Sequence, residues 1–326
     1  MIVFSDPAEV PHGFGPSAVT IGKFDGVHAG HRAVLTELID VARSEELSSV
    51  AVTFDRHPLA YHAPEKCPIS LVSLQQKVEL LERVGLDATV VLPYGRELAS
   101  QTADEFVERL LVNRLHAKVV LVGRDFRYGA GNTGDIDTLI QQGERLGFRV
   151  LVIDDVMPED HRRVSSTWIR ELLQRGDVDA AGRLLGHFPA VSGEVVHGEK
   201  RGRELGYPTA NLTARVEGFV PADGVYAGWL IDEGPVDAVI PDGYVEPRRT
   251  ARYPAAISVG TNPTFDDVRA PQIEAYAIDE TDLDLYGHRV EVQFVSRLRG
   301  MVAFDGVDAL VAQMADDVAD ARTALS

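Results

Sequence analysis

Cysteine is almost absent from this chain, and its scarcity excludes several kinds of site. Cys67 is the single cysteine among 326 residues. One thiol can form neither an intrachain disulfide nor a zinc cluster built from several cysteines. A chain without disulfides suits a reducing compartment, so we expect a cytoplasmic protein.

Long apolar runs and a basic leader are also missing. The first residues, MIVFSDPAEVPHGFGP, lack the positively charged start and the continuous apolar segment of a signal peptide. No run elsewhere reaches the roughly 20 apolar residues that a membrane-spanning helix needs. We therefore expect no membrane association.

Basic residues are fewer than acidic ones, and this difference indicates which charged molecules the protein can bind. Acidic residues outnumber them 50 to 32, and the net charge is −18 at pH 7. A field of this sign repels nucleic acid and anionic membrane surfaces, although the simplest interpretation is that it favours solubility. A small anion such as ATP is not excluded, because Mg²⁺, local Arg and Lys side chains and backbone N–H groups can hold it in one pocket.

The pattern of the sequence changes near residue 187. Before it, short apolar runs alternate with helical patterns, which is typical of a parallel sheet wrapped by helices, and one last helical segment spans residues 166–186. After it, Val-, Gly- and Thr-rich segments predict an all-β barrel, followed by one amphipathic terminal helix. We predict an α/β domain over residues 1–186 and a small β-barrel domain over residues 187–326.

The segment GKFDGVHAGH, residues 22–31, follows a predicted strand and begins a helix. Ligands of parallel sheets bind beyond the carboxyl ends of the strands, and helix N-termini favour phosphate. His28 and His31 are therefore candidate donors to the charge that develops on ATP phosphates during nucleotidyl transfer. The alternatives are two ordinary surface histidines or a metal site, and this motif alone does not decide between them.

A second candidate phosphate site is RVSSTWIR, residues 163–170, although a serine-rich helix cap would explain it alone. Together the two motifs resemble the nucleotidyltransferase superfamily, whose HxGH and SSTxxR-type signatures face one another across the ATP phosphates. That resemblance implies a Rossmann-like domain. The ATP- and phosphate-binding residues it implies in this half are Gly22, Phe24, Arg163, Ser165, Ser166, Thr167 and Arg170.

Two further segments narrow the resemblance to the FMN-adenylyltransferase form. They are VGRDFRYG, residues 122–129, and VTFDRHP, residues 52–58, which departs from the family's TFDPHP loop at Arg56. The resemblance implies that FMN attacks the α-phosphorus of ATP and that pyrophosphate leaves. The flavin-binding residues it implies here are Asp125, Phe126 and Arg127.

The most specific string is HGEKRGRELGYPTANL, residues 197–212. Its glycines allow close backbone approach to phosphates, its basic residues supply positive charge, and its Thr and Asn supply hard oxygens suited to Mg²⁺ that also binds ATP. A basic turn between two strands is the alternative. The phosphate candidates are Gly198, Lys200, Gly202 and Arg203, and the metal candidates are Thr209 and Asn211.

This string closely resembles riboflavin kinase, which is a small β-barrel enzyme, with Tyr207 in place of the commoner phenylalanine. Glu274 matches the position of that family's catalytic glutamate, which implies that it takes the proton of the riboflavin 5′-hydroxyl. Without the match, a strand glutamate is usually just a solvent-facing residue. Arg299 is a candidate flavin or phosphate contact, and an ion pair explains it equally well.

The chain as a whole resembles the bifunctional riboflavin kinase/FMN adenylyltransferases, the prokaryotic FAD synthetases. The resemblance implies riboflavin, FMN and ATP as substrates, FMN and FAD as products, and Mg²⁺ with ATP. Nucleic acid is not expected as a partner, and homo-oligomerisation stays open. The alternatives are a single adenylyl- or cytidylyltransferase with an inactive barrel, a flavin-binding or regulatory module, and a nucleic-acid-binding barrel, whose basic stripes with interleaved aromatic residues the second half lacks.

Overall fold

The computed structural model describes residues 1–154, 162–197, 207–236, 251–263, 269–280 and 283–326. The chain divides into two compact units, residues 1–69 with 74–166 and residues 70–73 with 167–326. Each unit has its own core and is described by itself. Among the described residues, no helix combines the length and the apolar character that crossing a bilayer requires.

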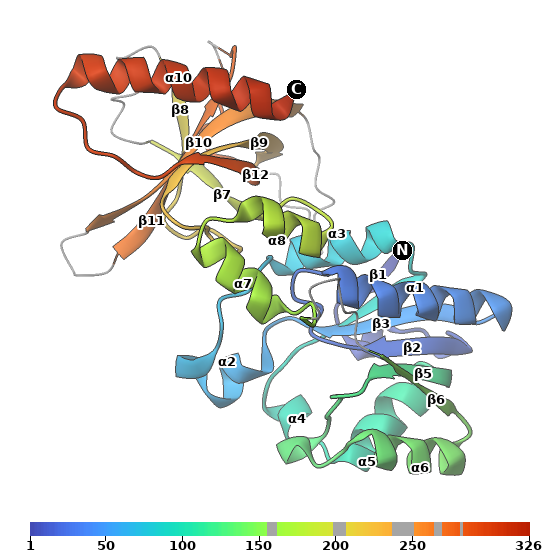
Figure 1. The fold of residues 1–326 in the computed structure, drawn as a ribbon. Helices are drawn as coiled ribbons and strands as arrows, with labels where there is room; N and C mark the ends of the chain where they lie inside the picture. Colours follow the sequence, from blue (N-terminus) through green and yellow to red (C-terminus); the bar gives the residue numbers. More distant parts are fainter. Residues whose placement is uncertain (155–161, 198–206, 237–250, 264–268, 281–282) are drawn as a thin grey trace. The chain divides into compact units, whose positions relative to one another are not determined.

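The first unit is built on a six-stranded parallel sheet (Figure 1). Its strands are β1 (Ile2–Phe4), β2 (Ser17–Ile21), β3 (Ser48–Phe54), β4 (Ala88–Leu92), β5 (Ala117–Gly123) and β6 (Arg149–Ile153). The strand order is β1-β4-β3-β2-β5-β6, so the order reverses between β2 and β5. In open α/β sheets this reversal marks the ligand-binding edge.

Helices pack on both faces of this sheet, and shorter helices lie in its connecting loops. They are α1 (Ala29–Ser44), α2 (Pro58–His62), α3 (Leu74–Val84), α4 (Arg96–Ala99), α5 (Ala103–Phe106), the π-helix η3 (Val107–Val112) that continues α5, and α6 (Ile136–Leu146). Short 3₁₀ turns lie at η1 (Pro7–Glu9), η2 (Pro64–Lys66) and η4 (Ala130–Asn132). Successive residues of one strand pack on opposite faces, since Ala18 joins the cluster that includes α1 and Val19 joins the cluster that includes η3 and α6.

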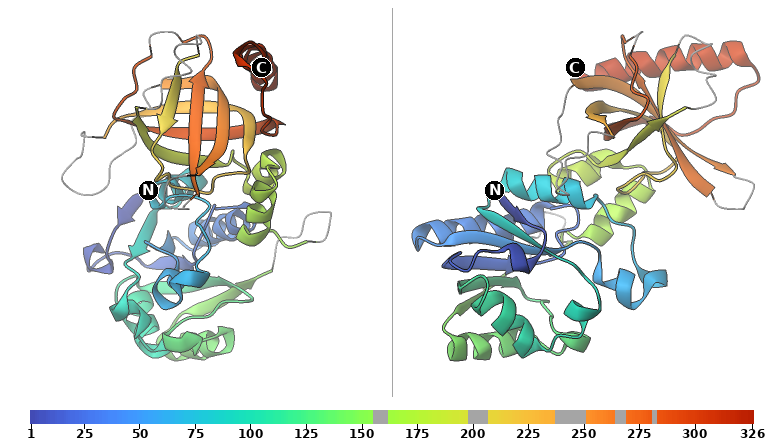
Figure 2. Two further views of the ribbon diagram at one scale, coloured as in Figure 1. Left: turned by 90° about the vertical axis from the view of Figure 1, so that its left-hand side faces the viewer. Right: turned by 180° about the vertical axis from the view of Figure 1, so that it is seen from behind.

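The second unit is a closed six-stranded antiparallel barrel in the order β10-β11-β8-β7-β12-β9 (Figures 1 and 2). The strands are β7 (Ala190–Val196), β8 (Thr209–Leu212), β9 (Gly224–Pro235), β10 (Ala251–Pro263), β11 (Arg269–Ala277) and β12 (His288–Arg299). Gly228 allows β9 to approach β12, because a Cβ there would lie 1.9 Å from the carbonyl oxygen of Gln293. The Rossmann-like sheet, the barrel and a terminal helix, α10 (Val307–Leu325), confirm the predicted fold class.

The segment predicted as one helix over residues 166–186 is two helices, α7 (Ser166–Gln174) and α8 (Val178–Leu185). Gly176 separates them with a φ of 79°, a left-handed conformation that ends a helix. Ile169, Leu173 and Leu185 are buried in the barrel's core cluster. The two helices therefore pack with the core of the barrel.

Candidate active sites

The loop between β2 and α1 holds the paired histidines at the carboxyl edge of the parallel sheet. His28 is the N-cap of α1, and its Nδ1 accepts a hydrogen bond from the backbone N–H of His31 at 3.4 Å. Nδ1 is thereby an acceptor, so a neutral His28 carries its proton on Nε2. A histidine at this position replaces the usual Ser, Thr, Asp or Asn cap and leaves one N–H to donate elsewhere.

The two imidazoles form a stacked pair. Their ring centroids are 3.7 Å apart, and the ring of Phe24 meets His31 edge-on at 5.3 Å. Phe24 is itself fitted against Gly22, where a Cβ would lie 3.0 Å from the Phe24 ring. Phe24, predicted as a nucleotide contact, is 2% exposed and supports the histidine pair from the core.

Both histidines are held neutral. Burial, followed by the charges of Arg163 and Arg32, lowers the pKa of His28 to about 4. Burial and the neighbouring His28 hold the pKa of His31 well below its usual value. His31 Nδ1 is buried and has no hydrogen-bond partner among the described residues. Neutral donors beside nearby guanidiniums suit an anion that arrives from outside.

Arg163 and Ser166 bring the serine-rich motif to the other loops of the first unit. Arg163 Nη1 donates to Asp125 Oδ2 at 3.1 Å. Ser166 Oγ donates to the carbonyl oxygen of Asp25 at 3.0 Å. Segments far apart in the sequence therefore converge where the sheet order reverses.

The remaining predicted residues of this half are distributed as follows. Phe126 stacks on Tyr128 at 5.4 Å between ring centroids, and Arg127 donates to the Phe126 carbonyl oxygen at 3.0 Å. Ser165 immediately precedes α7, while Thr167 and Arg170 lie on it in the second unit. The structure therefore places each of these predicted residues, and their contacts with substrates stay predictions.

The VTFDRHP segment spans the end of β3 and the short loop that leads to α2. Asp55 Oδ1 accepts from the backbone N–H of Tyr94 at 2.8 Å, and Asp55 Oδ2 pairs with the Arg56 guanidinium at 3.2 Å. His57 is the N-cap of α2 and accepts from the backbone N–H of Leu59. Arg56, which stands where the family's TFDPHP loop has proline, therefore supplies an ion-pair partner for Asp55.

The sequence analysis missed Lys77 on α3. This lysine is 9% exposed, and its Nζ donates to the Phe54 carbonyl oxygen at 2.7 Å and to the Lys23 carbonyl oxygen at 3.4 Å. The Lys23 carbonyl belongs to the loop after β2, and the Phe54 carbonyl belongs to the last residue of β3. A lysine in an amphipathic helix is normally predicted to lie on the surface, so no local feature of the sequence identifies Lys77 as buried.

In the barrel, Thr209 and Asn211 on β8 lie beside Glu274 on β11. Asn211 and Glu274 are directly paired in the antiparallel register. Asn211 Nδ2 donates to Thr209 Oγ1 at 3.0 Å, and Thr209 Oγ1 lies 3.5 Å from Glu274 Oε2. Gln272 Nε2 donates to Glu274 Oε1 at 2.6 Å. The sequence-predicted metal and base candidates therefore lie together although 63 to 65 residues separate them in sequence.

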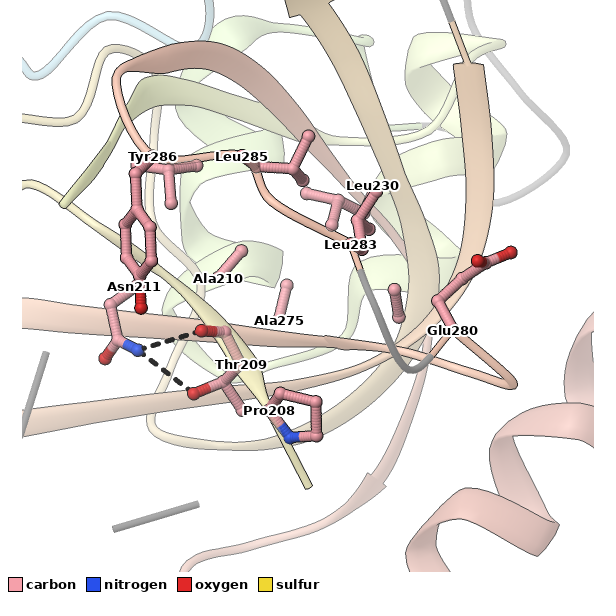
Figure 3. A pocket seen from close by; sticks show the side chains of 12 residues that line it. Pro208, Thr209, Ala210, Asn211, Leu230, Ala275, Glu280, Leu283, Leu285 and Tyr286 are labelled. Carbon is pink, nitrogen blue, oxygen red and sulfur yellow. Dashed lines mark hydrogen bonds between the residues drawn. The ribbon is translucent and has the colours of Figure 1, made fainter. Parts of the chain in front are cut away.

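A pocket adjoins this group (Figure 3). Its inner wall includes Ala210, Ala275 and Leu230, and its polar side includes Thr209 and Asn211. The dashed lines in Figure 3 show the Asn211 amide nitrogen donating to Thr209, which turns the amide oxygen away from that residue. The hydroxyl and amide oxygens are ligand types that suit Mg²⁺, which completes its shell with phosphates and water, and the Asn211 amide would have to turn over for its oxygen to share an ion with Thr209 Oγ1. No group of three His, Cys, Asp or Glu side chains that could enclose a metal occurs in the described part of the chain.

Arg299 is engaged within the second unit. Its guanidinium donates to both carboxylate oxygens of Asp317 on α10, at 2.7 and 2.6 Å. This is the ion pair that the sequence analysis left open, and a flavin contact stays a prediction. The phosphate candidates Gly198, Lys200, Gly202 and Arg203 lie outside the described residues.

Comparisons with known proteins match the two halves of the chain to two different families. A family model described as FAD synthetase matches residues 12–168, and one described as riboflavin kinase matches residues 185–325. Bifunctional riboflavin kinase/FMN adenylyltransferase of Escherichia coli K12 is 36% identical over 93% of this chain and 91% of its own. The Haemophilus influenzae protein of the same description is 33% identical over 94% and 93% of the two chains.

A solved structure shares the whole fold. A protein from Streptococcus pneumoniae, described as a macrolide-efflux protein, matches with a TM-score of 0.81 and 31% identity over 98% of both chains. The relatives are more than 30% identical to the chain over nearly its full length, and the chain carries the FAD synthetase family before the riboflavin kinase family. These two findings establish the family of the chain. The chain belongs to the bifunctional riboflavin kinase/FMN adenylyltransferases.

Proposed function

We propose that this chain phosphorylates riboflavin to FMN and adenylylates FMN to FAD, using ATP in both reactions. One observation carries the proposal: the histidine pair and the Thr209–Asn211–Glu274 group occur in one chain, each with its own fold unit. The family membership of the chain supports both activities. Adenylyl transfer is assigned to residues 1–186 and the kinase reaction to residues 187–326, because this boundary keeps the whole RVSSTWIR motif with the histidine pair, as the Ser166–Asp25 contact favours.

In adenylyl transfer, a phosphate oxygen of FMN attacks the α-phosphorus of ATP and pyrophosphate leaves. His28 donates from Nε2, and His31 and Arg163 supply further donors to the phosphates. No covalent nucleophile is required, because positioning and charge stabilisation supply the rate. The neutral state of both histidines in the free protein supports this role, since a bound polyphosphate would raise their pKa values and strengthen their hydrogen bonds.

In the kinase reaction, Glu274 takes the proton of the riboflavin 5′-hydroxyl, which attacks the γ-phosphorus of ATP and releases ADP. The hydrogen bond from Gln272 orients the carboxylate. Thr209 and Asn211 would hold Mg²⁺, which neutralises phosphate charge when bound. The placement of these oxygens across one strand pair from Glu274 supports the assignment.

We further propose that the protein acts in the cytoplasm and binds no nucleic acid. The single cysteine and the net charge of −18 support these two proposals.

The test is a time course with purified protein, riboflavin, ATP and Mg²⁺, in which flavins are separated chromatographically. FMN that appears before FAD supports both activities. FMN alone would restrict the function to the kinase. FAD formed only from added FMN would restrict it to adenylyl transfer, and no product from either flavin would leave a binding protein.

A further inference from the structure

Lys77 is a buried cation beneath the adenylyl-transfer loops. Only 9% of it is exposed, although lysine is almost never buried unless it is paired. Its ammonium donates to the carbonyl oxygens of Phe54 and Lys23, at 2.7 and 3.4 Å. Burying an ammonium group costs free energy that two carbonyl hydrogen bonds offset only in part.

The two carbonyls lie just beyond the last β2–β3 pair, at Lys23 after β2 and at Phe54, the final residue of β3, which is still paired with Leu92 of β4. The β2–β3 ladder ends at the pair Ile21 and Val52, with one more hydrogen bond from Gly22 N–H to the Val52 carbonyl. Beyond this ladder, the segment after β2 leads to the histidine pair, and the segment after β3 leads to Asp55. Besides Lys77, Thr53 Oγ1 donates to the Lys23 carbonyl at 3.3 Å.

The charges around Lys77 come from three elements. Asp25 and Asp55, in the loops after β2 and β3, raise its pKa, but burial dominates and lowers that pKa to about 8. His31, on α1, is also within electrostatic reach, and the charge of Lys77 helps to keep that imidazole neutral. The ammonium is therefore attracted by one carboxylate from each of the two loops.

We propose that Lys77 is a positioning residue for adenylyl transfer, tying the loop that leads to His28 and His31 to the end of β3, where the Asp55 loop begins. The tie holds both loops in place when the phosphates of ATP and FMN arrive. This inference rests on the proposed adenylyl transfer. The residue touches backbone and acts through the loops, so it contacts no substrate itself.

The test compares Lys77→Met, which keeps the length and apolar stem but removes the charge, with Lys118→Met. Lys118 is exposed on β5, so its substitution makes the same chemical change outside the loops. The kcat and KM of FAD formation from FMN and ATP are measured across pH 6 to 10, with riboflavin phosphorylation as an internal control. Circular dichroism and thermal unfolding report the folded fraction.

A misplaced catalytic loop is expected to lower kcat by about 10- to 100-fold, with smaller changes in the KM values. In the native protein, kcat/KM for FAD formation is expected to fall as pH rises through about 8, because the pKa of the buried Lys77 is lowered to that value and loss of its proton weakens the two loop contacts. Lys77→Met lacks this alkaline decrease, and Lys118→Met retains it. Riboflavin phosphorylation is unchanged in both variants.

Two outcomes overturn the proposal. One is a folded Lys77→Met protein with native kcat for FAD formation. The other is lower thermal stability with unchanged kcat and an unchanged alkaline decrease, which indicates a purely structural role. Should Lys77→Met fail to fold, Lys77→Gln, which also removes the charge, is measured in its place, and native kcat for FAD formation in that variant overturns the proposal. A native protein that forms no FAD contradicts the proposed function instead.

Discussion

His28 shows how one side chain can serve both local structure and chemistry. Its Nδ1 caps α1, which leaves Nε2–H as its donor. Replacement by alanine would confuse the two roles, because losing an N-cap costs about 1 kcal/mol by itself. Asparagine keeps a capping acceptor and removes the imidazole, so His28→Asn isolates the chemistry.

We expect His28→Asn to lower FAD formation from FMN by about 100-fold or more, the loss typical of removing one preorganised donor to transition-state charge. FMN formation from riboflavin should be unchanged, because Glu274 lies in the other unit. Both rates are measured by chromatography of the flavins. His12→Asn, at an exposed position, is the matched control. Equal loss of both activities in a folded His28→Asn protein would contradict the division of roles.

The low pKa of His28 also predicts acid sensitivity. The folded-state pKa is about 4 against an ordinary value of 6.5, so between these values the unfolded chain binds more protons than the folded one. The free energy of unfolding should therefore decrease as pH falls from 6.5 towards 4. Thermal unfolding at pH 7 and pH 5 should show a smaller decrease in His28→Asn than in the native protein. An identical decrease would show that other groups dominate.

At the scale of elements, the terminal helix is attached to the barrel by an ion pair and an apolar contact. Asp317 is 5% exposed and accepts both hydrogen bonds from Arg299. Val318 and Ala321 pack in a small cluster with Ala227 of β9. The amphipathic pattern predicted a helix here, but it could not show which strand arginine the helix would meet.

Asp317→Asn should lower the free energy of unfolding by about 1 to 3 kcal/mol, because it leaves the Arg299 guanidinium without its charge partner. Urea unfolding measures the change, and Asp320→Asn on the exposed face of the same helix is the control. If the pair only anchors α10, the KM for riboflavin stays at its native value. A raised KM with native stability would instead favour the predicted flavin contact of Arg299.

At the scale of the whole molecule, the central groups of the two proposed reactions lie in different fold units. The parallel sheet and the barrel have separate cores, and the histidine pair and Glu274 fall in different units. FMN is the product of one reaction and the substrate of the other. A chain defective in one reaction should therefore be complemented by a chain defective in the other.

Glu274→Gln should lower riboflavin phosphorylation by about 10²- to 10⁴-fold, the usual contribution of a general base, while FAD formation from added FMN is unchanged. Mixed with His28→Asn, it should restore conversion of riboflavin to FAD, measured by chromatography. Glu194→Gln, an exposed carboxylate on β7, is the control. Failure of the mixture, with each variant keeping its remaining activity, would show that FMN does not pass between chains.

Much of this protein could be predicted from local pattern. Strand and helix periodicity depend on neighbouring residues, so the parallel sheet, the barrel and α10 were predicted correctly. The motifs around His28, Arg163 and Thr209 are short strings whose chemistry can be read along the chain. The predicted single helix over residues 166–186 was wrong because Gly176, one residue inside an otherwise helical pattern, takes a left-handed conformation.

The sequence by itself determined the two fold classes, the family and the residue types available for each reaction, because these are properties of local periodicity and motif. Only the tertiary structure decided that the two imidazoles stack, that Arg299 pairs with Asp317, and that Lys77 lies buried under two loops. These contacts join residues that are distant in sequence or depend on how a loop turns. Their geometry and burial set pKa values and hydrogen-bond partners, which composition and spacing do not encode.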